Sequence, residues 1–137
     1  MALTHLLDTS VLTRLREPSV REAIEPGAQL GQLARAGISD LEVGFSARNA
    51  DEWDRLLDAL ETFTLIETTA VHMGRAKQVQ RLLAARHQRG RKLPDLLVAA
   101  AAEAGGLTVL HYDTDFDLIA GVTGQSCEWV VPAGSVD

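Results

Sequence analysis

The sequence predicts an α/β fold in which a short, mostly parallel sheet lies between two layers of helices. Short apolar runs alternate with amphipathic segments along the chain, and strands that alternate with helices form parallel sheets covered on both faces. The 137 residues are 46% hydrophobic, which suffices for one domain with its own core. No repeat or linker rich in proline and glycine divides the chain. We therefore expect a single domain over residues 1–137.

In the first half of the chain, short apolar runs predict the strands, and start and stop signals predict the helices. Pro18 favours a helix start, and Pro26-Gly27 is expected to stop that helix. Ser39 at the N-cap with Glu42 three residues later is typical of a capping box. Strands are expected over residues 4–7, 33–38 and 62–66, and helices over residues 9–16, 19–25, 39–48 and 51–60.

In the second half, the longest helix is expected over residues 70–87 and is stopped by Gly90. Its inner face is expected to carry Met73, Ala76, Val79, Leu82 and Leu83. The next helix starts at Leu93-Pro94-Asp95 with proline at N1, is rich in alanine, and ends at Gly105-Gly106. A buried strand over residues 107–110, a short helix over 116–120 and a strand over 128–131 complete the pattern.

The cysteine content and apolar runs bear on the cellular setting. The single cysteine, Cys127, excludes an intramolecular disulfide and a metal site built on cysteines, and fits a reduced, cytoplasmic setting. No targeting segment is visible, and the longest apolar run, Leu96–Ala102, is too short to span a bilayer. We expect a soluble cytoplasmic protein without a membrane partner.

Charge is distributed unevenly, although the net charge is only −6. Seven of the thirteen Lys and Arg residues fall between Thr68 and Pro94, where there is no acid. From Asp95 to Asp137 there are seven acids and no Lys or Arg. A basic stripe beside an acidic pocket suits a polyanion that passes a metal site. A solvated helix face explains the same stripe equally well.

Five acids stand where predicted strands meet predicted helices. The set is Asp8, Glu42, Asp95, Asp113 and Asp115. Like charges held close together repel and raise each other's pKa, so a cluster of carboxylates at one sheet edge calls for a cation. Hard oxygen ligands favour Mg²⁺, with Mn²⁺ as the alternative. Asp8, Glu42 and Asp95 each also have a local explanation as helix-start residues, so the case depends on the set.

Four segments occur in the order and spacing of a known family: LLDTSVL (residues 6–12), ISDLE (38–42), LPDLLVAA (93–100) and HYDTDF (111–116). Together they resemble the PIN-domain ribonucleases, and among these the VapC toxins of bacterial toxin–antitoxin pairs. The resemblance runs from about Leu6 to Val131. It implies a three-layer α/β/α PIN fold and a Mg²⁺-dependent endoribonuclease. The metal ligands that it implies are Asp8, Asp95, Glu42 and Asp113, with Asp115 assisting.

The resemblance also implies a mechanism and partners. Water activated by one or two metal ions hydrolyses an RNA phosphodiester bond, and Thr9 or Ser10 orients such a water. A homodimer and a cognate antitoxin that blocks the site are implied, with a higher assembly of the two. The predicted helix over 51–60 carries apolar residues that either contact the second copy or the antitoxin or pack in the core: Trp53, Leu56 and Leu57. Candidate RNA contacts in the basic stripe are Arg86, Arg89, Arg91 and Lys92.

Three other functions compete with a ribonuclease for the same residues. A haloacid dehalogenase-type phosphotransferase needs a second acid two residues after the first, where this chain has Ser10. A response-regulator receiver domain needs a late lysine, and no lysine follows Lys92. The alternative that stays open is a catalytically inactive PIN-like module that binds RNA or a partner. No pair of histidines has a spacing suited to a metal, and His111 is expected either to pack in the core or to touch substrate.

Overall fold

The computed structural model describes residues 2–88 and 92–137, and five strands in this part of the chain form one sheet. The strand order is β3-β2-β1-β4-β5, and each neighbouring pair is parallel. The chain thus winds outward from β1 in both directions, and all strands end at the same edge. This arrangement confirms the predicted α/β fold. The strands are β1 (His5–Leu7), β2 (Leu33–Ala36), β3 (Thr64–Ile66), β4 (Thr108–His111) and β5 (Cys127–Trp129).

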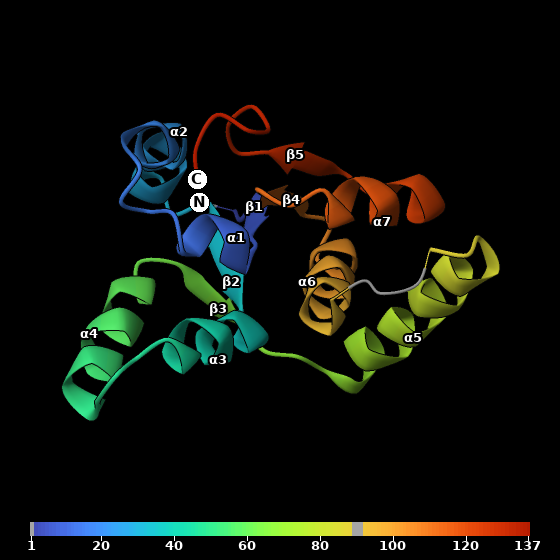
Figure 1. Cartoon of the computed structure of the whole chain (residues 1–137), viewed down its shortest axis with the longest axis horizontal. Helices are drawn as coiled ribbons and strands as arrows, with labels where there is room; N and C mark the ends of the chain where they lie inside the picture. The colour runs from blue at the N-terminus through green and yellow to red at the C-terminus, as the bar shows by residue number, and fades with distance from the viewer. Residues whose placement is uncertain (1, 89–91) are drawn as a thin grey trace.

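Helices cover both faces of the sheet. In Figure 1, α5, α6 and α7 lie on one side of the strands, and α2 and α4 lie on the other. The helices are α1 (Thr9–Leu12), α2 (Pro18–Gln29), α3 (Gly37–Phe45), α4 (Ala50–Leu60), α5 (Ala70–Ala85), α6 (Leu93–Ala104) and α7 (Asp115–Thr123). No helix in residues 2–88 or 92–137 is long and apolar enough to cross a membrane.

Two cores form, one on each face of the sheet, because successive residues of a strand point to opposite faces. Leu6 belongs to the core that the sheet makes with α5, α6 and α7, and its neighbour Leu7 belongs to the core on the side of α1 and α2. Both side chains are fully buried. The alanines of α6 let this helix pack closely, as predicted, and residues 98–102 are all buried. The close packing of α6 fixes the position of Asp95 in its first turn.

The end of α2 differs from the prediction, because the helix continues through Pro26 to Gln29. A proline in the last turn removes one hydrogen bond and leaves the preceding turns intact. The stop signal is instead Gly31, two residues beyond the helix, whose φ of 67° glycine adopts without strain. The Gly31 N–H donates to Ala28 O, and the Gln32 N–H donates to Gly27 O. These two bonds close a Schellman motif.

The predicted capping box of Ser39 and Glu42 is wrong. The helix α3 begins two residues earlier, after the extended Ala36, so Ser39 lies inside the helix and is fully buried. Its hydroxyl lies 2.8 Å from Thr9 Oγ1 of α1. A contact between two helices has thus replaced the local cap. The helix also ends earlier than expected, at Phe45.

The buried Arg35 holds α3 in place relative to the sheet. Its Nε donates to Asp40 Oδ1 at 2.8 Å, and its Nη1 donates to the carbonyls of Leu60 and Phe63. Arg35 is 4% exposed, so these bonds satisfy a charge that is costly to bury alone. The guanidinium ties β2 to α3 and to the end of α4, and α3 carries Glu42.

Other boundaries shift by a few residues. The helix α1 is shorter than predicted, α7 is longer, and β5 begins one residue earlier and ends two residues earlier. The inner face of α5 carries Ala76, Val79 and Leu83 as expected, but Met73 and Leu82 are 45% and 37% exposed, so their assignment to the core was wrong. The helix ends at Ala85, and the predicted stop at Gly90 lies outside the described residues.

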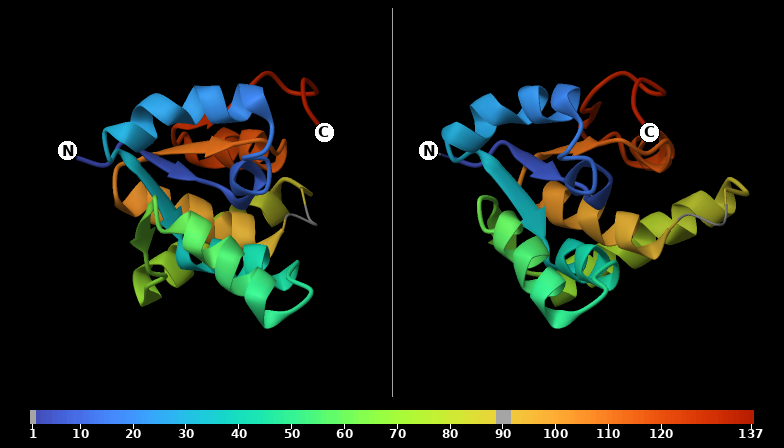
Figure 2. Two further views of the ribbon diagram at one scale, coloured as in Figure 1. Left: turned by 90° about the vertical axis from the view of Figure 1, so that its left-hand side faces the viewer. Right: turned by 60° about the vertical axis from the view of Figure 1, so that its left-hand side comes forward.

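The segment after β5 returns to the edge at which the strands end. In the left view of Figure 2, the arrows of β1 and β4 run from the side of the N-terminus toward the side where the C-terminus lies. The last residues of the chain therefore lie at the edge of the sheet where Asp8 and Asp113 follow their strands.

Candidate metal centre

A pocket opens at the carboxyl ends of β1 and β4, and four of the five predicted acids line it: Asp8, Glu42, Asp95 and Asp113. They come from four separate segments. Asp8 follows β1, Glu42 lies in α3, Asp95 lies in the first turn of α6, and Asp113 follows β4. The parallel strands all end here, so residues more than one hundred positions apart in the sequence meet in space.

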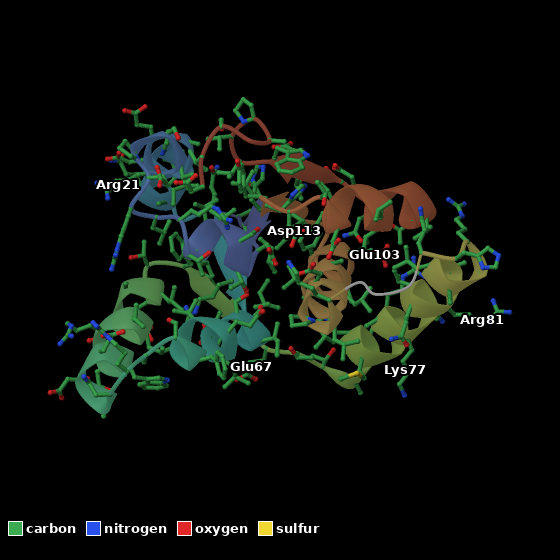
Figure 3. The ribbon with its side chains drawn as sticks, viewed as in Figure 1. Arg21, Glu67, Lys77, Arg81, Glu103 and Asp113 are labelled. Atoms are coloured by element: carbon green, nitrogen blue, oxygen red, sulfur yellow. The ribbon has the colours of Figure 1, made fainter. Side chains whose placement is uncertain are left out.

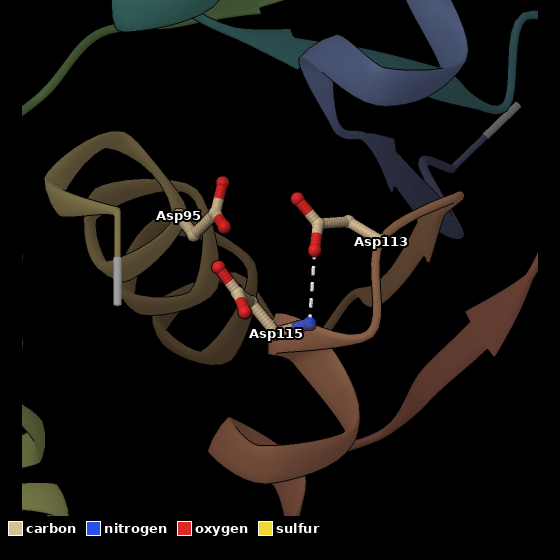
Figure 4. Close-up of side chains that lie close together, drawn as sticks. All are labelled: Asp95, Asp113 and Asp115. Atoms are coloured by element: carbon tan, nitrogen blue, oxygen red, sulfur yellow. Dashed lines mark hydrogen bonds between the residues drawn. The ribbon is translucent and has the colours of Figure 1, made fainter. Parts of the chain in front are cut away.

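The fifth acid, Asp115, joins Asp95 and Asp113 in a tight group. One ligand oxygen from each of the three carboxylates lies within 4.8 Å of the others. Figure 4 shows the three side chains converging from α6, from the loop after β4 and from the start of α7. The Asp115 N–H donates to Asp113 Oδ1 at 2.9 Å, which fixes the orientation of that carboxylate. Spacing of this kind suits a single divalent cation.

The two most buried acids each present an oxygen without a partner. Asp8 and Asp95 are 2% and 4% exposed. Asp8 Oδ2 accepts the Ser10 N–H at 3.0 Å and caps α1. Asp8 Oδ1 and Asp95 Oδ2 are buried and have no hydrogen-bond partner among the described residues. Buried polar atoms are nearly always satisfied, so these two oxygens point to a missing ligand.

The electrostatics of the pocket favour a bound cation. Burial raises the pKa of Asp8 despite the hydrogen bonds from Ser10. Burial and the nearby charges of Asp8 and Asp113 raise the pKa of Asp95 to about 8. A carboxyl with such a pKa holds a proton at neutral pH unless a cation replaces it. The residues present therefore fit a hard divalent metal ion.

Glu42 is oriented by hydroxyl groups on its neighbours. Thr9 Oγ1 donates to Glu42 Oε1 at 2.6 Å and lies 2.8 Å from Ser39 Oγ. A hydroxyl has a single proton, so Ser39 must donate to Thr9 when Thr9 donates to Glu42. Ser10 Oγ accepts the Tyr112 N–H at 2.8 Å. Both hydroxyls that were expected to orient a water are thus engaged in holding the site together.

Lys92 lines the mouth of the acidic pocket. Its Nζ is 2.5 Å from Asp113 Oδ2, and this hydrogen bond raises the pKa of Lys92. Burial would raise the pKa of Asp113, but the bonds from Lys92 and from the Asp115 N–H outweigh it and lower the pKa. An ammonium group thus neutralises part of the cluster. Sequence reasoning placed Lys92 near the RNA but missed this ion pair.

The rest of the basic stripe is spread over different surroundings. Arg75 pairs with Glu103 at 2.6 Å, and Arg86 donates to the Gly121 carbonyl at 3.3 Å. Figure 3 shows Lys77 and Arg81 pointing outward from α5, away from Asp113. Arg89 and Arg91 lie outside the described residues. Among the described residues of the stripe, Lys92 alone lines the pocket.

His111 packs in the core, which is one of the two roles expected for it from the sequence. It is fully buried, and its ring stacks on Phe116 with centroids 4.9 Å apart. Its Nδ1 accepts the Asp113 N–H at 3.2 Å, and burial lowers its pKa. A neutral histidine in this position supports the loop that carries Asp113.

Sequence reasoning missed one wall of the pocket. Arg14, Tyr112 and Trp129 line it, together with Ala133, Gly134 and Val136. The sequence gives no local signal for this wall, because its parts lie in three distant segments. The pairing of β4 with β5 and the contact of Arg14 with the Tyr112 ring bring the first three together, and the chain after β5 then returns onto them.

The five-stranded parallel sheet and the carboxylates at its edge define a class of protein, and comparison with known families agrees. The family model of the PIN domain matches residues 5–122. The chain therefore belongs to the PIN-domain family. Within that family it groups with the VapC proteins. It is 66% identical to "Ribonuclease VapC51" of Mycobacterium tuberculosis over 137 residues, which cover 100% of both chains.

Solved structures show the same fold. A DNA-bound VapBC from Salmonella typhimurium superposes with a TM-score of 0.76 at 17% identity, covering 94% of this chain and 99% of that chain. A toxin–antitoxin complex from Klebsiella pneumoniae superposes with a TM-score of 0.65 at 26% identity, covering 93% and 98%. The three-layer architecture predicted from the sequence is thus confirmed.

Proposed function

We propose that this chain is a Mg²⁺-dependent endoribonuclease of the VapC type, with Mn²⁺ as an alternative cation. The observation that carries the proposal is the group of Asp95, Asp113 and Asp115, beside which buried oxygens of Asp8 and Asp95 have no partner among the described residues. The high identity to a protein named as a ribonuclease supports the choice of substrate. The intact set of acids disfavours an inactive PIN-like module.

Each acid has a role that follows from its surroundings. Asp95, Asp113 and Asp115 would hold the cation, and the buried Oδ1 of Asp8 would be a further ligand. Asp115 also fixes Asp113 through its N–H. Thr9 keeps the Glu42 carboxylate aimed into the pocket, where it orients the attacking water. When bound, the cation supplies acidity to that water and offsets charge on the scissile phosphate. The products would carry a 3′-hydroxyl and a 5′-phosphate.

Lys92 would change partners when the cation binds. Its ammonium neutralises Asp113, and Asp113 would no longer need it once Asp95, Asp113 and Asp115 held a divalent ion. The freed ammonium, 62% exposed at the pocket mouth, is then available to the RNA phosphate. Arg86 is a second candidate contact in the described part of the stripe.

The partners proposed are a cognate antitoxin and a second copy of the chain. The Klebsiella pneumoniae chain of similar fold was solved in a toxin–antitoxin complex, and this supports an antitoxin partner for this chain. Trp53 is 47% exposed on α4, and Leu41 and Phe45 are 70% and 91% exposed on α3. Exposed apolar side chains of this size suit a homodimer or an antitoxin interface.

Cleavage of purified structured RNAs tests the proposal. We expect the parent to cut in Mg²⁺ or Mn²⁺, to stop in EDTA, and to leave 5′-phosphate ends. Asp95→Asn and Asp8→Asn should each lose about 100-fold or more in rate, because a metal ligand is removed. Asp51→Asn is the matched control, since Asp51 lies in the first turn of α4 and is exposed.

Two results would refute the assignment. One is cleavage by Asp95→Asn at the parental rate. The other is RNA binding by the parent without cleavage at saturating Mg²⁺ or Mn²⁺, which would favour the inactive module. Titration of Mn²⁺ by calorimetry, without RNA, separates loss of the metal site from loss of catalysis.

A further inference from the structure

Arg14 and Tyr112 form a wall of the pocket directly beside the metal centre. Arg14 lies just after α1, which Asp8 caps, and Tyr112 immediately precedes Asp113. Both residues line the same pocket as the acids. A phosphate bound at the cluster would therefore lie in the pocket that this wall borders.

The guanidinium of Arg14 is held in a fixed plane. Its Nη1 donates to the Ser10 carbonyl at 2.7 Å, and its central carbon lies 4.8 Å from the centroid of the Tyr112 ring. Its Nε donates to the main-chain oxygen of Asp137 at 2.8 Å. A planar guanidinium that is stacked on an aromatic ring is preorganised to bind phosphate oxygens.

The segment Ala133–Asp137 covers this wall through its own backbone. The Tyr112 hydroxyl donates to Val136 O at 2.8 Å, and the Val136 N–H donates back to it at 3.1 Å. Gly134 has a φ of 80° and lets the segment turn onto the pocket. With the Arg14 bond, three hydrogen bonds hold the segment against two side chains.

We propose that Arg14, stacked on Tyr112, is the subsite for an RNA backbone phosphate next to the scissile one, and that the segment Ala133–Asp137 occupies this subsite in the free protein. This inference rests on the proposed function. The Asp137 oxygen on Arg14 Nε takes the place of a phosphate oxygen. RNA must displace the segment, so the segment and the substrate compete.

The charges of the pocket explain why Arg14 is needed. Its described lining carries four carboxylates from the predicted set, and a polyanion entering it is repelled. Arg14 and Lys92 are the basic residues of that lining, and Lys92 is paired with Asp113. Arg14 donates to main-chain oxygens instead. It can therefore exchange the Asp137 oxygen for a phosphate oxygen without releasing an acid of the cluster, whether Lys92 is paired with Asp113 or freed by a bound cation.

Two substitutions should have opposite effects on RNA affinity. Arg14→Ala removes the subsite, and we expect KM for RNA to rise about tenfold with a smaller change in kcat. Tyr112→Phe removes both hydrogen bonds to Val136 but keeps the ring under Arg14, so KM should fall by about threefold. Anisotropy of labelled RNA in EDTA measures the same effects without cleavage.

Three controls separate a phosphate contact from a structural defect. Arg16→Ala removes an exposed arginine two residues away and should leave KM unchanged. A plot of log affinity against log salt concentration should become less steep by about 0.7 in Arg14→Ala, because this variant loses one phosphate contact to a single strand. The steepness should not change in Arg16→Ala. Mn²⁺ affinity and the melting temperature should stay near parental values in Arg14→Ala.

The proposal is overturned if Arg14→Ala binds RNA as the parent does, or if Tyr112→Phe weakens binding as Arg14→Ala does. Its failure differs from failure of the proposed function. A parent that binds RNA through Arg14 but never cuts would refute the nuclease alone. Cleavage by Arg14→Ala with the parental KM would refute the subsite alone.

Discussion

Asp95 lies in the first turn of α6, where the helix dipole favours a negative charge by about 0.3–1 kcal/mol. The same residue is buried beside Asp8 and Asp113, and these effects oppose ionisation. The raised pKa shows that burial and like charge outweigh the dipole. Asp95 thus requires a proton or a metal ion near neutral pH, whereas a helix-start aspartate in water requires neither.

The pH dependence of stability follows from this pKa. In metal-free protein, Asp95 keeps its proton in the folded state up to a pH of about 8, while in the unfolded chain it loses the proton near its ordinary value of 3.8. The folded state therefore binds more protons in this window. The stabilisation is complete below pH 4 and is lost as pH rises toward 8, with a slope of at most about 1.4 kcal/mol per pH unit.

Urea unfolding in EDTA between pH 5 and pH 8 measures this slope. Asp95→Asn cannot titrate and should show a flatter profile, as should the parent at saturating Mn²⁺, because the ion replaces the proton. Parallel profiles for the parent and Asp95→Asn in EDTA would show that Asp95 does not control this window. Asp8, whose pKa is also raised, contributes in the same direction.

At the scale of single elements, the sequence predicted most helices and strands but placed several ends wrongly. Pro94 in the first turn of α6 and Gly105-Gly106 after its end act as local signals, and the predicted start and end were right, although Pro94 lies at N2 rather than N1. The predicted N-cap at Ser39 was wrong because the Ser39 hydroxyl contacts Thr9 of another helix, and no local pattern encodes that contact. The predicted helix stop at Pro26 was wrong because the loss of one hydrogen bond in the last turn does not end a helix. The stop signal comes later, at Gly31.

Two glycines within helices offer a matched test of packing between α3 and α4. A Cβ on Gly44 would lie 2.5 Å from Trp53 Nε1, while a Cβ on Gly74 meets nothing within 4 Å. Gly74→Ala should raise the free energy of unfolding by about 0.5–1 kcal/mol through helix propensity. Gly44→Ala should lower it by about 1–3 kcal/mol, because Trp53 must move from α3.

Chemical unfolding of the two variants and the parent measures the sign of each change in the free energy of unfolding. Equal stabilisation by the two substitutions would mean that Trp53 does not pack firmly on Gly44. Tryptophan fluorescence of folded Gly44→Ala should change as well, since the indole is displaced, whereas that of Gly74→Ala should match the parent.

For the whole molecule, the acids were predictable as a set because parallel strands end at one edge. Asp8 and Asp113 needed only the strand pattern, and β1 and β4 are indeed paired neighbours. The wall of Arg14 and Tyr112 was not predictable. Arg14 meets Asp137 across 123 positions of sequence, and neither residue belongs to a recognisable motif. Contacts of this kind depend on the path of the last segment rather than on any local preference.

Expression in a bacterial host tests the proposed role as a toxin. We expect induction of the parent to arrest growth and co-expression of the protein encoded by the adjacent gene to restore it. Asp95→Asn should allow growth yet still capture that protein in a pull-down, because the substitution changes one buried side chain. Growth of cells that express the intact parent at high level, without the adjacent gene, would contradict the toxin assignment.

The strand order has a consequence for synthesis of the protein. Asp8 is made early, but the strand that pairs with β1 on the side of the pocket is β4, and Asp113 and Asp115 follow it. Chains are made from the N-terminus, so the carboxylates cannot converge until more than four fifths of the 137 residues have left the ribosome. An unfinished chain holds only part of the cluster. The ribosome that makes this protein is therefore not exposed to the complete acidic cluster until translation is nearly over.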